Sequence, residues 1–300
     1  MKSKYQIYTL VILCVLFWSG NFVVGRYIKD DIEPLEMVFF RWGFTLILVS
    51  PILFLNYKRV ISTIKNHFLI LISLAILGIS LFNTLLYIGL NTTSSTNALI
   101  INSSIPMLIL IFSFIIFKTK IKFIQIIGII LSSFGVLYLI LKGQVLNINN
   151  IVFTIGDLWV VLSSFAWALY STLVRLKPKD ISDMEYFSII VLFGFIILLP
   201  FYLYQGYSIQ KELILVQENF LIFIYISVFT SILSYYFWHQ GIKYLGASKT
   251  GQFTHLMPIF GTILAYIFLG EILQNYHLVG AILIIFGIYL SLFYKEQNEK

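Results

Sequence analysis

The chain has 300 residues, of which 59% are hydrophobic and only 11% are charged, and it carries a net charge of +7. Soluble globular proteins contain about half apolar and about a quarter charged residues, so this composition excludes a water-facing globule and predicts a protein covered by the lipid bilayer. The basic residues lie in short loops between apolar runs, so membrane orientation explains their excess and no nucleic-acid partner is expected.

Ten apolar runs follow one another along the chain, each close to the ~20 residues that a helix needs to cross the hydrocarbon core. In chain order they cover roughly residues 7–27, 34–56, 67–90, 96–117, 121–141, 155–176, 184–205, 217–241, 246–269 and 276–294. No small-residue cleavage site follows the first run, so we interpret it as a retained helix rather than a signal peptide. The runs predict an all-α membrane protein of ten transmembrane helices.

Lysine and arginine set the expected orientation, because cytoplasmic loops carry an excess of both residues. If the N-terminus is cytoplasmic, fifteen of these residues fall in predicted inner segments and one, Arg41, falls inside the second run. The four in predicted outer loops are Arg26, Lys29, Lys142 and Lys211. Both termini are therefore predicted to be cytoplasmic.

The second half of the chain repeats spaced residues of the first half. Trp18, Arg26, Glu36 and Pro51 recur 149 residues later as Trp167, Arg175, Glu185 and Pro200. Gly89, Pro106, Gly128 and Gly135 recur 152 residues later as Gly241, Pro258, Gly280 and Gly287. We interpret this pattern as two five-helix repeats, residues 1–145 and 146–300, with about three extra residues in the outer loop near Lys211.

Five crossings per repeat is an odd number, so the second repeat is predicted to enter the membrane from the opposite side. Two inverted repeats have similar energies facing in and facing out, which suits a carrier that works by alternating access. Solute sites in such folds lie near the midplane, where the repeats meet.

Polar residues precede a proline in both the fourth and the ninth run, STNALIINSSIPMLIL and ASKTGQFTHLMPIFGTIL. Proline removes an N–H group and frees a carbonyl one turn earlier, which then needs a side chain, water or ligand. Asn97, Asn102, Gln252 and His255 are therefore candidates to line a substrate cavity. The alternative is that they hydrogen-bond neighbouring helices as packing contacts.

Aromatic and polar side chains also share the segments WSGNFVVGR and WALYSTLVR, which are equivalent in the repeat. Trp18 and Asn21 in the first, and Trp167 and Tyr170 in the second, are candidates for one wall of an amphipathic cavity. Membership of an interfacial aromatic belt is the alternative for these residues.

Two further residues complete the candidate set, and Arg41 is considered separately from it. Tyr87 and His239 occupy equivalent repeat positions, and we interpret His239 as a structural or cavity-lining group rather than a proton relay. Arg41 lies a turn or two inside the second run, and we expect it to snorkel outward rather than to anchor an acidic ligand.

Signatures of enzymes and metal sites are missing from the sequence. There is no HExxH helix, Walker loop or GxSxG elbow, the four histidines are dispersed, and Cys14 is the one cysteine. We therefore predict no catalytic residue, no metal site and no cofactor.

The segments VFFRWGF, TNALIINSSIP, GDLWVVLSSFAWALYS, WHQGIKYLGASKTGQF and YHLVGAILIIFGIYL, in this order, resemble the EamA-type family of the drug/metabolite transporter superfamily over nearly the whole chain. The resemblance implies a bacterial inner-membrane carrier with a central cavity lined chiefly by helices 1, 3, 4, 6, 8 and 9. The family often ends helix 4 with a glutamate, whereas this chain has Thr119 there and Glu271 at the end of helix 9.

The resulting prediction is a monomer-sized carrier that exports an amino acid or a related small amphipathic metabolite by alternating access. Three alternatives stay open: a lipophilic-drug exporter, a metabolite importer, and an intramembrane enzyme or scaffold. A weak homo-oligomer is compatible with the sequence.

Overall fold

The computed structural model describes residues 3–28, 32–93, 95–144, 154–270 and 272–293. Every regular element within these ranges is helical, which confirms the predicted all-α class. The first half contains α1 (Lys4–Ile28), α2 (Pro34–Leu55), α3 (Tyr57–Ala75), the π-helix η1 (Ile76–Leu81), α4 (Phe82–Leu90), α5 (Ser95–Asn102), α6 (Ile105–Phe117) and α7 (Phe123–Ile140). The second half contains α8 (Ile155–Leu173), η3 (Val174–Leu176), α9 (Asp183–Tyr204), α10 (Ile209–Glu218), α11 (Phe220–Tyr225), the π-helix η4 (Ile226–Leu233), α12 (Ser234–Leu245), α13 (Ala247–Gly251), the 3-10 helix η5 (Gln252–Leu256), α14 (Met257–Leu269) and α15 (Asn275–Phe293).

Eight helical segments of the described residues are long and apolar enough to cross a membrane, so the protein is a multi-span membrane protein. They coincide with the second to eighth and the tenth predicted runs. The first predicted run lies on α1, and the ninth lies on α13, η5 and α14, where a 3-10 turn interrupts the α-helix ahead of Pro258. Glu271 and Lys29, which entered the sequence interpretation, lie outside the described residues.

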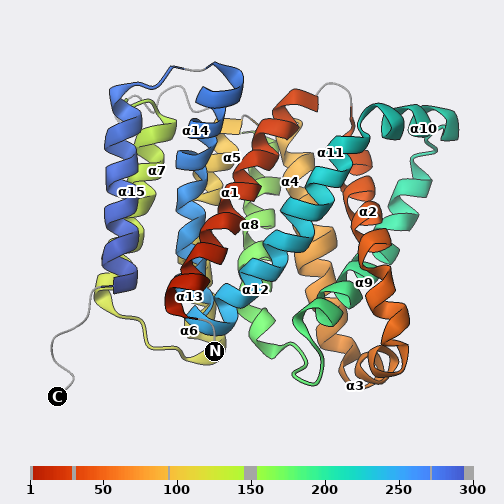
Figure 1. Ribbon diagram of the computed structural model, residues 1–300. Helices are drawn as coiled ribbons and strands as arrows, with labels where there is room; N and C mark the ends of the chain where they lie inside the picture. The colour runs from red at the N-terminus through yellow and green to blue at the C-terminus, as the bar shows by residue number, and fades with distance from the viewer. Residues whose placement is uncertain (1–2, 29–31, 94, 145–153, 271, 294–300) are drawn as a thin grey trace.

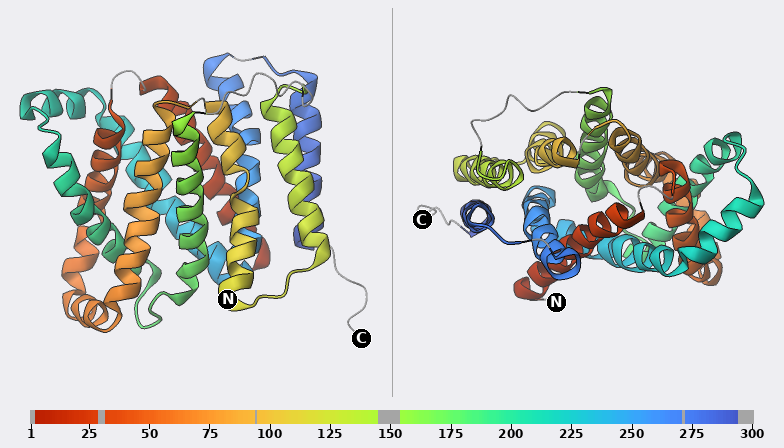
Figure 2. Two further views of the ribbon diagram at one scale, coloured as in Figure 1. Left: turned by 180° about the vertical axis from the view of Figure 1, so that it is seen from behind. Right: turned by 90° about the horizontal axis from the view of Figure 1, so that it is seen from above.

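Helix α1 begins and helix α15 ends at the same end of the helical bundle (Figure 1). We call this the proximal end and the opposite one the distal end. The start of α3 lies at the proximal end, whereas α10 lies at the distal end (Figure 1). Figure 2 shows α7 and α15 side by side at one edge of the molecule, with α10 at the opposite edge.

The helix boundaries follow the repeat found in the sequence. Helices α2 and α9 begin and end 149 residues apart, whereas α3 and α10 begin 152 residues apart. The three additional residues therefore lie in the connection 205–208, where the first half has Asn56 alone. Lys211, which we had placed in this loop, lies within α10 because the chain is already helical from Ile209. The π-helices η1 and η4 also occupy corresponding places in the two halves.

Two ion pairs connect the halves at equivalent positions. Arg59 donates from Nε to Glu185 Oε1 at 2.9 Å, and Lys211 Nζ lies 3.5 Å from Glu36 Oε1. Both carboxylates are buried at the first turn of a helix, while both basic side chains are more than half exposed. Because Arg59 is in α3 and Lys211 is in α10, the two equivalent pairs lie at opposite ends of the molecule (Figure 1).

Helices α7 and α15 pack closely through glycines that are equivalent in the repeat. A Cβ atom built on Gly128 would lie 2.5 Å from the carbonyl oxygen of Gly287, and one built on Gly287 would lie 2.6 Å from that of Gly128. A Cβ on Gly280 would similarly lie 3.2 Å from the carbonyl oxygen of Gly135. The pairing of 128 with 287 and of 135 with 280 makes the helices antiparallel. Small residues permit this close backbone approach in a membrane protein, where helix association depends on packing.

Replacing Gly128 with alanine is expected to lower the free energy of unfolding by about 1–3 kcal/mol, because the added methyl group meets backbone that cannot move aside. Gly261 is the matched control, since it lies within α14 and a Cβ there meets no atom within 4 Å. Gly261→Ala should leave stability unchanged or raise it by up to about 1 kcal/mol, through helix propensity alone. Melting temperatures of the purified variants in detergent test this difference, and equal effects would contradict the packing described for α7 and α15.

Candidate functional site

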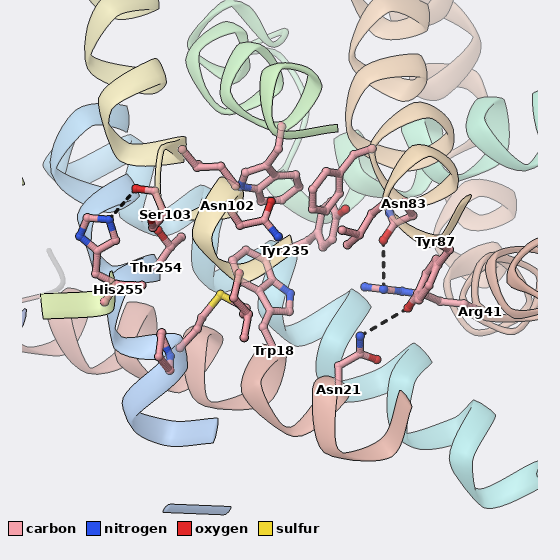
Figure 3. Close-up of a pocket in the computed structure, with 18 residues that line it drawn as sticks. Trp18, Asn21, Arg41, Asn83, Tyr87, Asn102, Ser103, Tyr235, Thr254 and His255 are labelled. Atoms are coloured by element: carbon pink, nitrogen blue, oxygen red, sulfur yellow. Dashed lines mark hydrogen bonds between the residues drawn. The ribbon is translucent and has the colours of Figure 1, made fainter. Parts of the chain in front are cut away.

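A cavity of about 90 Å³ lies between the two halves (Figure 3). Its lining residues are Trp18, Asn21, Arg41, Phe82, Asn83, Leu86, Tyr87, Leu99, Asn102, Ser103, Ile105 and Val136 from the first half, and Trp167, Tyr235, Thr254, His255, Met257 and Pro258 from the second. All six segments expected to line a cavity contribute. Helix α2 adds Arg41 and helix α7 adds Val136.

The structure brings six of the ten candidate residues together around this cavity. They are Trp18, Asn21, Tyr87, Asn102, Trp167 and His255. The other four, Asn97, Tyr170, His239 and Gln252, are buried elsewhere. The cavity therefore draws on both repeats, but it does not use every pair of equivalent positions.

Aromatic rings form the middle of the cavity wall. The Trp18 and Trp167 rings meet edge to face with their centroids 5.3 Å apart, and Phe82 lies 4.7 Å from Trp167. Trp18 also donates from Nε1 to the carbonyl oxygen of Thr230 in η4, at 3.0 Å. The π-helical backbone and the indole thus hold each other in place.

A hydrogen-bonded histidine forms a second part of the wall. His255 Nδ1 lies 2.7 Å from Ser132 Oγ on α7, and Nε2 lies 2.9 Å from the carbonyl oxygen of Ser103. Ser103 lies in the break between α5 and α6, where its carbonyl oxygen accepts from the His255 side chain. Both ring nitrogens of His255 are therefore occupied by the fold. Nearby, Asn102 Oδ1 accepts a hydrogen bond from Ser164 at 2.8 Å.

Arg41 does not snorkel outward, as the sequence analysis expected, but points into the protein with only 4% of its surface exposed. Figure 3 shows its guanidinium group directed from α2 toward the cavity, next to Asn83 and Tyr87. It donates from Nε to Ser231 Oγ at 2.9 Å and from Nη1 to Asn83 Oδ1 at 3.2 Å. The expectation was wrong because α4 and η4 supply neutral acceptors inside the bundle, so the charge does not need to reach the surface.

Two polar pairs occupy equivalent positions in the repeat, one of them in the lining of the cavity and the other outside it. Asn21 Nδ2 lies 3.5 Å from Tyr87 Oη, and both partly exposed side chains line the cavity. Tyr170 Oη lies 2.7 Å from His239 Nε2, and this pair is almost completely buried outside the cavity. Tyr170 and His239 are the repeat equivalents of Asn21 and Tyr87.

Tightly packed aromatic residues surround the second pair. The His239 ring lies 5.2 Å from that of Tyr186 and 6.1 Å from that of Tyr235, and none of these side chains is more than 1% exposed. Trp238 donates to Ser171 Oγ at 3.2 Å in the same layer. We call Tyr170, Tyr186, Tyr235, Trp238 and His239 the aromatic layer. It lies where α8 ends and α9 begins, against the first half of α12, toward the proximal end (Figure 1).

The two remaining candidates have separate surroundings. Asn97 donates to Asp157 Oδ2 at 3.4 Å, next to a 2.5 Å hydrogen bond from Thr93 to Oδ1 of the same carboxylate. Gln252 is fully buried, and neither polar atom of its side chain has a hydrogen-bond partner within the described residues.

Sequence reasoning missed Asn83 and Tyr235 as cavity residues. They are separated by 152 residues, which is the offset of that part of the repeat, so extending the alignment to polar and aromatic pairs could have found them. Among the described residues, no group of three or more His, Cys, Asp or Glu side chains could hold a metal ion.

The model of the EamA-like transporter family matches residues 6–141 and again residues 154–293. The chain belongs to this family. Its two-repeat architecture and a general transporter role follow, since the family consists of transporters.

Similar proteins agree with this assignment. The uncharacterized transporter YyaM of Bacillus subtilis is 29% identical over 94% of this chain and 92% of its own, and YetK of the same organism is 26% identical over 100% and 90%. A solved crystal structure superposes with a TM-score of 0.71 over 96% of this chain and 97% of its own, at 14% identity, which supports the fold alone.

Because the fold occupies both ring nitrogens of His255, His255→Ala is expected to lower stability by about 1–3 kcal/mol, through the lost hydrogen bond to Ser132 and the Ser103 carbonyl oxygen left unpaired. His67→Ala is the control, since His67 is exposed on α3 and should change stability little. Thermal unfolding without ligand tests this prediction. Equal stability of the His255→Ala variant and the unmodified protein would show that the two hydrogen bonds contribute nothing.

Proposed function

We propose that the protein exports a small amphipathic metabolite, of the amino-acid type, by alternating access of its central cavity. The observation that carries this proposal is the unequal state of two equivalent polar pairs. Asn21 Nδ2 and Tyr87 Oη are 3.5 Å apart, and both side chains face the cavity. Tyr170 Oη and His239 Nε2 are 2.7 Å apart, and both side chains are buried in the aromatic layer. A carrier made of two inverted repeats requires such a difference in each of its end states, because one mouth is open while the other is closed.

The position of the cavity supports this interpretation. When two copies of a fold are related by a two-fold axis, a residue that contacts its own equivalent lies on that axis. Trp18 contacts Trp167, and Ser103 accepts from His255, which is its equivalent at the 152-residue offset. Both contacts line the cavity, so we place it on the axis, as expected for the substrate site of an inverted-repeat transporter.

The proposed topology has ten crossings, formed by the eight apolar segments together with α1 and the α13–η5–α14 series. Residues 1–145 and 146–300 form the two inverted halves, and the location of the equivalent ion pairs at opposite ends supports this inversion. We place both termini in the cytoplasm of a bacterium, with the protein in its inner membrane, from the fifteen-to-four distribution of basic residues. The proximal end is then cytoplasmic, and the cavity faces outward in this state.

The proposed substrate class follows from the walls of the cavity. Indole and aliphatic groups suit an apolar side chain, while Asn102, Arg41 and Tyr87 offer polar contacts. Export is the direction that the family resemblance implies. The mostly apolar lining also favours a second candidate, the export of lipophilic compounds, which substrate assays separate from the first.

Labelling of repeat-equivalent positions tests alternating access. In a Cys14→Ser background, the Asn21→Cys variant should react with a membrane-impermeant thiol reagent added outside, and the Tyr170→Cys variant with reagent added inside. We expect reagent bound at one position to prevent labelling at the other in the double variant, because the two mouths open in turn. Simultaneous labelling of both positions in every molecule would indicate a channel and contradict the proposal.

Counterflow in proteoliposomes tests transport itself. Vesicles loaded with unlabelled phenylalanine should accumulate external labelled phenylalanine transiently, and protein-free vesicles are the control. Counterflow of a lipophilic dye but of no amino acid would contradict amino-acid export and support the second candidate, the export of lipophilic compounds.

A further inference from the structure

Arg41 is a buried cation for which the described residues supply no counter-charge. Its partners are the hydroxyl group of Ser231, the amide oxygen of Asn83 and the carbonyl oxygen of Thr230, at 2.9, 3.2 and 3.1 Å. The ion pairs found in the described part of the chain involve other basic residues, namely Arg59, Lys177, Lys211 and Lys243. Within the part of the chain that the structure describes, Arg41 is therefore held in the bundle by neutral groups.

The guanidinium group retains donors for a further partner. It has five N–H groups, of which the three hydrogen bonds use one each on Nε, Nη1 and Nη2. One N–H group remains on Nη1 and one on Nη2. A carboxylate accepts two such bonds side by side, which is why arginine is favoured where carboxylates are recognised.

A buried charge without a counter-ion is costly, and charged residues within membrane spans commonly mark substrate pathways. Among the lining residues that the structure describes there is neither aspartate nor glutamate, and Arg41 is the one permanently charged side chain. The remaining wall is largely aromatic and aliphatic, with Trp18, Phe82, Leu86, Trp167 and Met257. The chemical complement of such a site is a small molecule with a single negative charge and an apolar body.

We propose that Arg41 binds the carboxylate of the transported molecule, and that the substrate is a small monocarboxylate with an apolar or aromatic group. This inference rests on the proposed function, since it treats the cavity as the transport site. The α-carboxylate of an apolar amino acid satisfies it, and so does a carboxylate that lacks an amine.

The contacts of Thr230 allow Arg41 to turn toward such a ligand. The Thr230 carbonyl oxygen accepts from Trp18 Nε1 as well as from Arg41 Nη2. When the guanidinium group moves to a carboxylate, the indole N–H therefore keeps this carbonyl paired. Ligand binding at Arg41 is in this way connected to α1 and to the π-helix η4.

The test uses the full-length protein in detergent and three probes that share a phenyl group: phenylalanine, 3-phenylpropionate and phenylalaninamide. A ligand that binds the folded state raises the melting temperature by mass action. The two carboxylates should raise it, whereas the amide, which lacks the negative charge, should not. Equal shifts with the amide and the acids would overturn the proposal, as would the absence of any carboxylate-dependent shift.

Variants at the site identify the group responsible. Arg41→Gln should weaken 3-phenylpropionate binding at least about tenfold, in line with the loss of charge-assisted hydrogen bonds. The matched control is Arg175→Gln, the same change at an exposed arginine, which should leave binding intact. Unchanged affinity of the Arg41→Gln variant would show that Arg41 only connects α2 to α4 and η4.

Asn83→Asp is a second variant that keeps the shape of the site. It places a carboxylate where Asn83 Oδ1 lies 3.2 Å from Nη1 and removes the hydrogen bond from Nδ2 to the Ile79 carbonyl oxygen. Because Arg41 then has a counter-charge from the protein, the variant should lose the shift caused by 3-phenylpropionate. A full ligand shift in this variant would overturn the proposal, even if Arg41→Gln does not fold.

The proteoliposome assay separates this inference from the proposed function. Counterflow of neutral or cationic compounds without any carboxylate would keep the transporter and remove the role of Arg41. Carboxylate binding that depends on Arg41, without transport of any probe, would support the carboxylate site at Arg41 and contradict the proposed transport function.

Discussion

A helix inside a membrane must hydrogen-bond its backbone N–H and C=O groups within the protein, because the hydrocarbon core offers no hydrogen-bond partners. This protein departs from regular α-helix at four places around the cavity: the π-helices η1 and η4, the break between α5 and α6, and the 3-10 turn η5. At three of these places a side chain donates to a backbone carbonyl. The donors are Tyr235 to Gly78, Trp18 and Arg41 to Thr230, and His255 to Ser103. All four donors line the cavity, so the irregular backbone and the wall of the site depend on each other.

This dependence explains why the polar groups of the wall have unequal freedom to bind a solute. The two ring nitrogens of His255 are both occupied, and Trp18 uses its one donor for the backbone. Arg41 has more donors than the fold uses, and it shares its carbonyl acceptor with Trp18. The same wall thus contains groups whose hydrogen bonds maintain the fold and a cation that retains hydrogen-bonding capacity for a ligand. Irregular helical turns are frequent at functional sites, where they redirect side chains and carbonyls in this way.

The helices could be located from the sequence because apolar run length is a direct requirement of the bilayer. The prolines likewise indicated irregular backbone near Pro106 and Pro258. The inward direction of Arg41 was not predictable, since its acceptors come from Asn83 and Ser231, which are 42 and 190 residues away. The π-helices could not be predicted from the hydropathy pattern, which does not distinguish them from α-helix. Each π-helix changes the direction in which the following side chains point. Tyr235, which follows η4, was therefore missed as a cavity residue.

The repeat predicted equivalent positions but could not predict equivalent surroundings. Trp18 and Trp167 contact each other at the cavity, which places both on the axis of the proposed inverted repeat. Tyr87 and His239 lie away from the axis, and one faces the cavity while the other is enclosed by the aromatic layer. If the halves are inverted, equivalent residues away from the axis must have different surroundings in a conformation that is open at one end only. Two of the four candidates that lie outside the cavity here, Tyr170 and His239, would then line it when the opposite end opens, and a single conformation shows only one half of that exchange.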